Sequence, residues 1–433
     1  MKTISRRTFL RGAAAGAASF FILPRHVLGG PGYTPPSEVL NHAVIGCGGM
    51  GQGHIGYVLD EAKRGLSRLA ALCDVDRDHL ARSLKKAPPD CKGYHDFREV
   101  LAREDIDVVH IVTPPHWHAL MAVAAAEAGK DIFCEKPMTR TIGEARKVAE
   151  AVQRNGRIFR LNTWFRLYGN FYGLGCPVKP VKKLVENGLL GWPVTVRVSR
   201  HTGFNWKAGM WCGKIGVPPE PVPEALDYDF WLGPAPYKPY FRHRTHKSFR
   251  GYWDYDGGGL ADMGQHYLDP VQYVLGKDGE SPVRVEAEAP WPPHPDAVLL
   301  WGRVELTYRD GCRIILESCE WGEEETKGKP YMEGPEGKLY RGFKTDPPSL
   351  AEKVKELPDP EPQLADFDRA VRTRRKFGLN EENGHRSNLL VHLANAAIRT
   401  GRVLRFDSET ERFIDDPGAD RLVDPPMRAP WTL

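Results

Sequence analysis

The segment HAVIGCGGMG, residues 42–51, decides the fold of the N-terminal half of this 433-residue chain. An apolar run over 43–45 leads into the pattern G-x-G-x-x-G at 46–51, and a helix-like stretch follows. In this pattern the first glycine permits a tight turn, the second lets a pyrophosphate approach, and the third lets helix and strand pack closely. We therefore interpret the segment as a dinucleotide-binding fingerprint that opens a βαβ unit.

The dinucleotide contacts predicted from this segment extend to the next apolar run, RLAALCD, which ends in Asp74. Its carboxylate can hold a ribose diol, although it comes later than the usual ~20 residues after the fingerprint. A 2′-phosphate would meet that negative charge, so Asp74 favours NAD, but Arg77 is near enough to leave NADP open. The residues predicted here to bind the cofactor are Gly46, Gly48, Gly49, Met50, Gly51 and Asp74.

A second informative segment is FCEKPMT, residues 133–139. Glu135 and Lys136 directly follow the apolar strand DIFC. Open α/β sheets bind their ligands at the carboxyl ends of the strands, so a lysine there can reach a substrate oxygen. The alternative, a solvated surface pair, is less compatible with that position.

The spacing of apolar residues divides the chain into parts of different architecture. Residues 1–30 carry a twin arginine and an Ala/Gly-rich run, and 31–41 form a Pro/Gly linker. Strands and helices alternate over 42–163, which predicts a parallel doubly wound sheet. Over 164–415 the strands alternate apolar and polar residues, and TYRDGCRI predicts an antiparallel hairpin. The Pro-rich tail 416–433 has no core of its own and is expected to wrap the surface or a partner subunit.

Four motifs in this order resemble the Gfo/Idh/MocA oxidoreductase family over roughly residues 41–405. They are the glycine loop, TPPHWHA at 113–119, the EKP of 135–137, and GGGLADMGQHYLD at 257–269. The resemblance implies an α/β fold with an N-terminal Rossmann dinucleotide-binding domain. It also implies a C-terminal α/β substrate domain with an open, mainly antiparallel sheet.

The resemblance also implies roles for particular residues. Lys136 becomes the electrophilic or proton-relaying group, Asp262 its partner, and His266 the acid or base. If 257–269 is helical, the i, i+4 spacing puts Asp262 and His266 on one face, where the carboxylate can fix the imidazole tautomer. Asp269, three residues later, is expected to orient His266 or to bind substrate.

Two loops complete the expected site. By resemblance, the loop of Thr113, Pro114 and His118 contacts the nicotinamide ribose and pyrophosphate, next to Glu135 and Lys136. After the last Rossmann strand, many relatives have Gly-Thr-Gln-x-Arg; Arg166 fits that pattern, whereas Trp164 departs from it. The residues predicted to bind substrate are Lys136, Trp164, Arg166, Asp262, His266 and Asp269. His116 and His118 lack a third ligand, so no metal site is expected.

Composition limits the other possibilities. A net charge of +4 from 60 basic and 56 acidic residues gives no reason to expect a nucleic-acid partner. The eight cysteines show no zinc spacing, and no disulfide framework is expected. The segment SRRTFLR followed by GAAAGAASFFILP predicts Tat export to the periplasm or cell envelope, and its apolar run is short for a stable membrane span.

Two enzyme functions remain open from the sequence. The first is a nicotinamide-dependent oxidoreductase acting on a hydroxyl of a sugar, glycoside or cyclitol, with tightly bound NAD. The alternative is an NAD-dependent glycoside hydrolase working by transient oxidation, elimination, hydration and re-reduction. The aromatic-rich insert 201–255 suits pyranose faces, although its rings can equally staple the loop. A non-catalytic carbohydrate-binding protein is a third possibility, and we expect a homo-oligomer formed through the C-terminal sheet.

Overall fold

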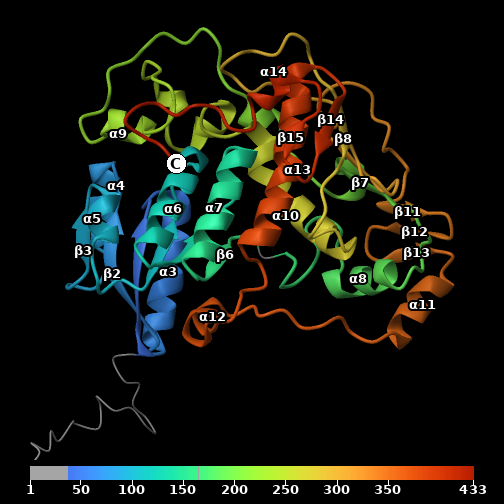
Figure 1. Ribbon diagram of the computed structural model, residues 1–433, viewed down its shortest axis with the longest axis horizontal. Coiled ribbons are helices and arrows are strands. Elements are labelled where there is room, and N and C mark those ends of the chain that lie inside the picture. The colour runs from blue at the N-terminus through green and yellow to red at the C-terminus, as the bar shows by residue number, and fades with distance from the viewer. Residues whose placement is uncertain (1–37, 164) are drawn as a thin grey trace, which may run out of the picture.

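The computed structural model describes residues 38–163 and 165–433. The predicted export signal, most of the linker and Trp164 lie outside the described residues. Two sheets with their covering helices lie side by side in the molecule, and the long helices α10 and α13 run between them (Figure 1). The predicted fold class is confirmed by this arrangement.

The first sheet is entirely parallel, with strand order β3-β2-β1-β4-β5-β6. Its strands are β1 Leu40–Ile45, β2 Ser67–Cys73, β3 Lys92–Tyr94, β4 Val108–Ile111, β5 Asp131–Cys134 and β6 Phe159–Leu161. Its helices are α3 Gly49–Lys63, α4 Arg77–Leu84, α5 Phe97–Leu101, α6 His118–Glu127 and α7 Ile142–Arg154. The order reverses between β1 and β4, which places a ligand crevice at their carboxyl ends.

Sequence signals for these elements act as expected. The central strands β4 and β5 are buried along their whole length, because helices cover both faces of a parallel sheet. Helix α7 begins at Thr141, whose hydroxyl accepts the Glu144 backbone N–H. Helix α6 is apolar nearly all round and is correspondingly buried.

The second sheet has nine strands in the order β13-β12-β11-β7-β10-β9-β8-β14-β15. All neighbouring pairs are antiparallel except β7 with β10. The predicted hairpin joins β9 to β10 and pairs Thr307 with Arg313. The strands are β7 Thr195–Ser199, β8 Arg284–Glu288, β9 Arg303–Thr307, β10 Arg313–Glu317, β11 Met332–Gly334, β12 Gly337–Tyr340, β13 Lys344–Asp346, β14 Leu404–Asp407 and β15 Arg412–Phe413.

Helices join the two halves of the molecule. Helix α13 packs against β8 and β9 of the second sheet, against α10, and against α7 of the first domain. The helices of this half are α8 Val178–Glu186, α9 Tyr228–Leu232, α10 Gly258–Val274, α11 Ser349–Glu356, α12 Phe367–Thr373, α13 Glu381–Thr400 and α14 Pro417–Asp420. The helix α12 returns to the first domain, where Phe367 joins its core.

The aromatic insert 201–255 folds over the first domain as a set of short turns around its own hydrophobic cluster. Most of its rings are buried in packing, including Trp206, Trp231 and Tyr252, so they staple the loop. Trp211 and Trp231 nevertheless line the cavity described below.

The tail 416–433 wraps the chain's own surface. The ring of Trp431 packs edge-on against Trp117 at 4.8 Å and stacks on Phe230 at 5.9 Å, both centroid to centroid. Arg428 donates to the Asp229 carboxylate at 2.6 Å. The tail therefore fastens the insert to the first domain.

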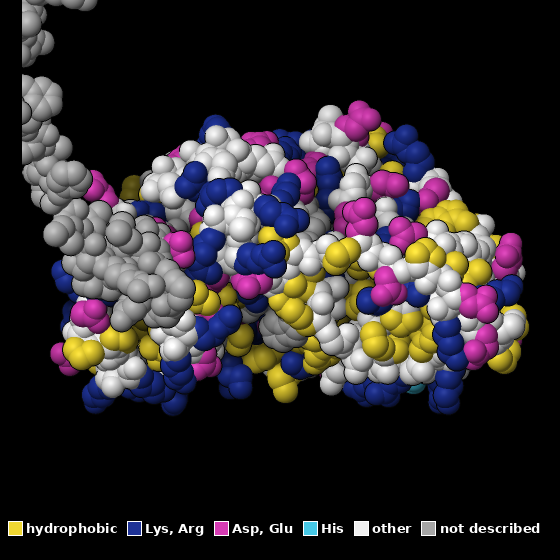
Figure 2. All heavy atoms as spheres, turned by 90° about the horizontal axis from the view of Figure 1, so that it is seen from below, with side chains coloured by type: hydrophobic (Ala, Val, Ile, Leu, Met, Phe, Trp, Pro, Cys, Tyr) yellow, Lys and Arg dark blue, Asp and Glu magenta, His cyan; other side chains and the backbone are white. Residues whose placement is uncertain are grey.

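The surface carries both signs of charge. Basic and acidic side chains are interspersed over the face in Figure 2. A group of hydrophobic side chains lies on the part of this face that the second domain forms. None of the helices within residues 38–163 and 165–433 is long and apolar enough to cross a membrane. All eight cysteines are free thiols, and seven of them are buried.

Candidate active site

A cavity of about 360 Å³ opens at the carboxyl ends of β1, β2, β4 and β5. One end is formed by the glycine loop and Asp74, and the other by Lys136 and Asp262. The insert contributes Trp211, His246, Lys247 and Arg250 to its wall. The cavity therefore connects the dinucleotide fingerprint to the predicted catalytic residues, across both domains.

The glycine loop has the shape that its sequence predicts. Gly46 has a φ of +96°, and a Cβ there would lie 2.6 Å from the Val112 carbonyl oxygen. A Cβ on Gly51 would lie 2.0 Å from the Gly46 oxygen, whereas one on Gly49 would meet nothing within 4 Å. Helix α3 begins at Gly49, so the first backbone N–H groups of the helix lie at the end of the glycine loop. Those N–H groups and the open space at Gly49 fit a pyrophosphate.

Asp74 lines the cavity and also braces the loop. Its carboxylate accepts the Cys47 backbone N–H at 2.7 Å and the Asp76 N–H at 2.8 Å. The His79 ring nitrogen lies 3.5 Å away, and its hydrogen bond to Asp74 raises the pKa of His79. The carboxylate is thus fixed beside the cavity wall that would receive a ribose.

Lys136 reaches from the end of β5 to the start of α10. Its Nζ donates to the Asp262 carboxylate and to the Asp262 carbonyl oxygen, each at 2.7 Å. Arg250 Nε donates to the same carboxylate at 2.7 Å. Burial opposes the charge on Asp262, but these two cations hold the pKa of its carboxyl well below the usual range. Asp262 therefore binds two cations in place of the predicted imidazole.

His266 lies one turn further along α10 and is buried. The ring of Phe165 meets it edge-on at 5.3 Å. Burial, with the nearby positive charge of Lys136, lowers the pKa of His266 to about 3. The imidazole is therefore neutral near pH 7, and unlike Lys136 and Asp262 it is not among the residues that line the cavity.

Asp256 is a site residue that the sequence prediction missed, although it directly precedes the Gly257 motif. It lines the cavity, and its Oδ1 has no hydrogen-bond partner among the described residues. Burial raises the pKa of Asp256 to about 7, against the opposing effect of Arg250. Arg250 was missed as well, because nothing in its local pattern shows that it faces Asp262.

The raised pKa of Asp256 predicts a pH-dependent stability. The folded protein holds this proton more tightly than the unfolded chain, whose aspartates titrate near pH ~4. The free energy of unfolding should therefore fall as the pH rises from there towards about 7. In Asp256→Asn that part of the decline should disappear in urea unfolding at a series of pH values. Identical pH profiles for the two proteins would contradict the assignment.

The loop of Thr113, Pro114 and His118 is only partly at the cavity. Thr113 and Pro114 line it. His118 is fully buried, and its two ring nitrogens contact the Thr113 and Pro137 carbonyl oxygens, each at 2.8 Å. The His118 ring thus links the loop after β4, at Thr113, to the loop after β5, at Pro137. His116 contacts the Trp231 carbonyl oxygen at 3.0 Å, so both histidines are occupied by backbone.

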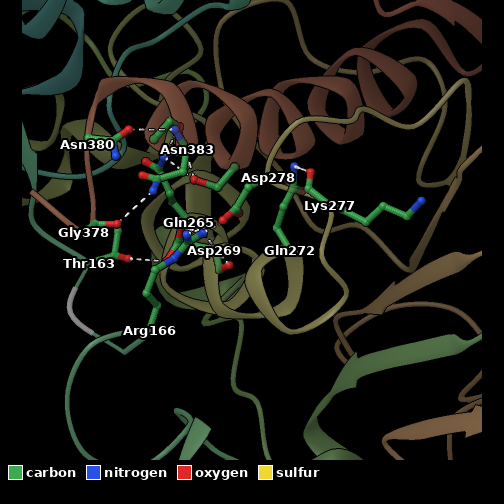
Figure 3. Close-up of polar contacts among 12 residues, drawn as sticks. Thr163, Arg166, Gln265, Asp269, Gln272, Lys277, Asp278, Gly378, Asn380 and Asn383 are labelled. Atoms are coloured by element: carbon green, nitrogen blue, oxygen red, sulfur yellow. Dashed lines mark hydrogen bonds and ion pairs between the residues drawn. The ribbon is translucent and has the colours of Figure 1, made fainter. Parts of the chain in front are cut away.

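Arg166 and Asp269 do not reach the cavity, contrary to the prediction that they bind substrate. Arg166 forms ion pairs of 2.7 Å with Asp269 and with Asp278, and the side chains of Arg166 and Asp269 are fully buried (Figure 3). Burial raises the pKa of Asp269 to about 6 although Arg166 opposes the shift. The cluster joins the segment after β6 to α10 and holds the helix that carries Asp262 and His266.

Removing Arg166 should therefore cost stability. In Arg166→Met the buried Asp269 loses its partner, and the free energy of unfolding should fall by about 3–5 kcal/mol. Asp269→Asn should cost less, because Arg166 keeps Asp278. Denaturant unfolding measures both. If Arg166→Met left the stability unchanged and raised KM, Arg166 would instead be a substrate-binding residue.

A parallel sheet with this strand order, a glycine loop and a cavity shared with a second α/β domain define a two-domain dinucleotide-binding protein. The family is identified by residues 40–163, which match "Oxidoreductase family, NAD-binding Rossmann fold", and by 174–433, which match "Oxidoreductase family, C-terminal alpha/beta domain". The chain belongs to the Gfo/Idh/MocA family of oxidoreductases, and its first domain is an NAD-binding domain.

Relatives with curated names cover parts of the chain. It is 30% identical to inositol 2-dehydrogenase of Salmonella typhimurium (strain LT2) over 162 residues, 37% of this chain and 46% of that protein. It is 39% identical to glycosyl hydrolase family 109 protein 2 of Shewanella sp. (strain ANA-3) over 122 residues, 26% of this chain and 27% of that one. The chain thus spans less than half the length of either curated relative.

Solved structures share the fold over most of the chain. The WlbA dehydrogenase of Bordetella pertussis, in complex with NADH and UDP-GlcNAcA, matches with a TM-score of 0.56 at 18% identity. The match covers 85% of this chain and 99% of that one. Aldose-aldose oxidoreductase from Caulobacter crescentus matches with a TM-score of 0.53 at 19% identity, over the same shares of the two chains.

Proposed function

We propose that the protein oxidises or reduces a hydroxyl-bearing carbon of a sugar, glycoside or cyclitol, with NAD held tightly. One observation carries this proposal: the Lys136 ammonium is fixed by Asp262 at the far end of the cavity that begins at the glycine loop. The relatives named above include an inositol 2-dehydrogenase, an aldose-aldose oxidoreductase and a dehydrogenase solved with NADH and UDP-GlcNAcA. They support the substrate class.

The residues divide the work as follows. Bound NAD supplies the hydride chemistry, and Gly46, Gly48, Gly49, Met50 and Gly51 would hold its pyrophosphate. Lys136 donates a hydrogen bond to the reacting oxygen, so that negative charge developing there is stabilised. Asp262 holds the ammonium in place. His266, one turn along α10 from Asp262, is proposed to accept the hydroxyl proton as the hydride leaves.

The second candidate is an NAD-dependent glycoside hydrolase. The 39% identity to a glycosyl hydrolase family 109 protein favours it, although the matched part covers about a quarter of each chain. In that scheme NAD would supply the oxidation of a ring hydroxyl while the same residues assist the proton transfers. The neighbouring C–H proton would be removed, the aglycone would leave, water would add, and the ketone would be reduced again. The cofactor ends each turnover as it began.

We propose that the protein is located in the periplasm or cell envelope and is exported by the Tat route. The twin-arginine segment SRRTFLR supports this proposal. An exported protein that must keep its cofactor is best served by tight binding. Association of two or more copies through the second sheet remains a prediction, measurable by light scattering of the purified protein.

The test is mass spectrometry of the nucleotide released from natively purified protein, followed by assays without added NAD. We expect stoichiometric NAD. Cleavage of an aryl glycoside, with solvent deuterium entering the carbon next to the oxidised one, would establish the hydrolase. Reaction of myo-inositol or levoglucosan only when a second ketone is supplied would establish the oxidoreductase. Nucleotide-free protein that neither cleaves nor oxidises any of these compounds would overturn the proposal.

A further inference from the structure

Three buried histidines form a continuous chain beneath the candidate site. His54 of α3 lies with Nε2 3.0 Å from the Glu135 carboxylate. Its Nδ1 lies 2.9 Å from Nδ1 of His110, on β4, and Nε2 of His110 lies 2.9 Å from Nδ1 of His42, on β1. The three rings are at most 4% exposed. Two ring nitrogens of His54, two of His110 and one of His42 thus contribute to a single line of hydrogen bonds.

The chain has two different ends. Glu135 lines the cavity beside Lys136. At the other end, Nε2 of His42 points towards the Asp368 carboxylate at 3.8 Å, about 0.9 Å beyond an ordinary hydrogen bond, and has no other partner among the described residues. Asp368, on α12, accepts from Tyr57 at 3.1 Å and Ser67 at 2.7 Å. In Figure 1, α12 lies beside the end of α3 that is far from the cavity.

We propose that His42, His110 and His54 form a proton relay between Asp368 and Glu135. The relay serves the hydride chemistry of the proposed function and in that respect rests on it. The three links from Glu135 to His42, at 2.9–3.0 Å, are within the distance over which a proton moves along a hydrogen bond. The outer link, from His42 to Asp368 at 3.8 Å, must shorten before a proton can cross it.

The ionised Glu135 fixes which ring nitrogen donates in each hydrogen bond of the resting histidine relay. Besides the ring of His54, its carboxylate accepts an N–H from Asn162 at 2.6 Å and from the Lys136 backbone at 3.1 Å. Because a carboxylate only accepts, His54 must carry its proton on Nε2. His110 then donates from Nδ1 to the bare Nδ1 of His54, and His42 donates from Nδ1 to the bare Nε2 of His110.

Every ring therefore holds one proton at rest, and Nε2 of His42 is bare. Burial lowers the pKa of His42 to about 4 and that of His110 well below its usual value, so neither ring gains a lasting second proton near pH 7. Two cations oppose it as well: Arg372 near His42, and Arg160 near His110. The relay passes a proton without storing a charge on any imidazole.

Proton passage towards the cavity balances atom by atom. A proton taken up by the Asp368 carboxylate passes to Nε2 of His42, which leaves Asp368 ionised again, and the proton on Nδ1 of His42 moves to Nε2 of His110. The proton on Nδ1 of His110 moves to Nδ1 of His54, and the proton on Nε2 of His54 moves to Glu135. One proton enters, Glu135 becomes neutral, and each ring still holds one proton. Glu135 can then return to the cavity the proton that ketone reduction consumes through His266, the acid or base of the proposed reaction.

After that passage every donor points the other way. The chain can then carry a proton from Glu135 outwards to Asp368 without any ring turning over. Rotation of these three buried rings would be slow, because Phe133 packs on His54 at 4.6 Å and on His110 at 4.8 Å between ring centroids. The relay therefore suits a turnover that takes up one proton and gives one back, as a cycle with a retained cofactor does.

The first test needs no substrate. In the holoenzyme labelled with ¹⁵N in histidine, ring ¹⁵N shifts at pH 7 should show protons on Nε2 of His54 and on Nδ1 of His110 and His42. The signals are assigned by their loss in His54→Gln, His110→Gln and His42→Gln. A doubly protonated ring, or a link in which both nitrogens are bare, would overturn the relay.

The second test measures passage with His110→Gln. A glutamine amide can donate to His54 and accept from His42, but it cannot hand a proton on. NADH-loaded protein is mixed with the 2-keto derivative of myo-inositol in weak buffer containing a pH dye. In the wild type, proton uptake should keep pace with NADH oxidation. In the variant NADH oxidation and proton uptake should both slow by about 10²-fold, the lower range for acid–base groups, because the resting Glu135 holds no proton to give.

The control is His392→Gln, which alters a half-buried histidine that contacts the Thr139 carbonyl oxygen outside the relay. It should leave both signals unchanged. If His110→Gln does not fold, His42→Gln interrupts the outer link in the same way. NADH oxidation and proton uptake at wild-type rates in the folded variant would overturn the relay. If the wild type does not oxidise NADH with this ketone, the proposed substrate class fails, and the tautomer measurement still decides the relay.

Discussion

Replacing Lys136 with methionine is expected to lower turnover by about 10²–10⁴-fold, the range that positioned acid–base groups contribute. The fold and the bound NAD should remain. Lys136 is the cation at the end of β5 that faces the cavity, and its ammonium lies 2.7 Å from Asp262. Its removal does not leave Asp262 as an unpaired buried charge, because Arg250 still binds that carboxylate at 2.7 Å. Loss of activity in this variant therefore reports on chemistry and not on folding.

The matched control for this prediction is Lys247→Met. Lys247 lines the same cavity but is exposed, and its ammonium lies 5.9 Å from the Trp211 ring centroid. It should keep turnover close to that of the wild type. The measurement is kcat in the assay that the substrate panel identifies, with nucleotide content determined in parallel. A Lys136→Met protein with near-normal kcat would remove Lys136 from the mechanism.

The sequence predicted the parts of the structure that local patterns encode. The glycine loop, the strand DIFC followed by Glu135 and Lys136, and the Asp-Gly hairpin are each decided by neighbouring residues, and the structure has each of them. The family resemblance supplied the second sheet and the link between the two halves. The family matches confirm that resemblance.

Predictions of partners across the fold were less successful, for a physical reason. The i, i+4 spacing describes one face of α10 and correctly puts Asp262 and His266 near each other. It says nothing of Lys136 from β5 or Arg250 from the insert, whose charges attract the Asp262 carboxylate more strongly than a neutral imidazole does. Likewise, the sequence prediction assigned Arg166 to substrate binding. It could not foresee the ion pair with Asp278, because that contact depends on the turn after α10.

The histidine chain was invisible for the same reason. His42, His54 and His110 belong to a strand, a helix and another strand, and each alone fits an ordinary core position. Only the parallel pairing of β1 with β4 brings His42 beside His110. A sequence pattern gives the period of one element, whereas a relay depends on the distances between elements.

A single methyl group on Gly51 is expected to abolish cofactor retention. The Cβ of Gly51→Ala would lie 2.0 Å from the Gly46 carbonyl oxygen, which is backbone and cannot rotate away. Helix α3 must then move off β1, so its first N–H groups leave the position where they would meet the pyrophosphate. We also expect a loss of about 3 kcal/mol in the free energy of unfolding, the upper end of ordinary overpacking costs.

Gly53→Ala is the matched control, because it makes the same substitution two residues further along the same helix. A Cβ on Gly53 would meet nothing within 4 Å, so only the helix propensity changes. That variant should retain NAD and gain up to about 1 kcal/mol of stability. The comparison requires nucleotide content by mass spectrometry and urea unfolding of the two proteins. If Gly51→Ala were purified with stoichiometric NAD, the close packing of helix and strand would not be what positions the cofactor. The contrast between two alanines in one helix separates the geometry of the fingerprint from any general effect of losing a glycine.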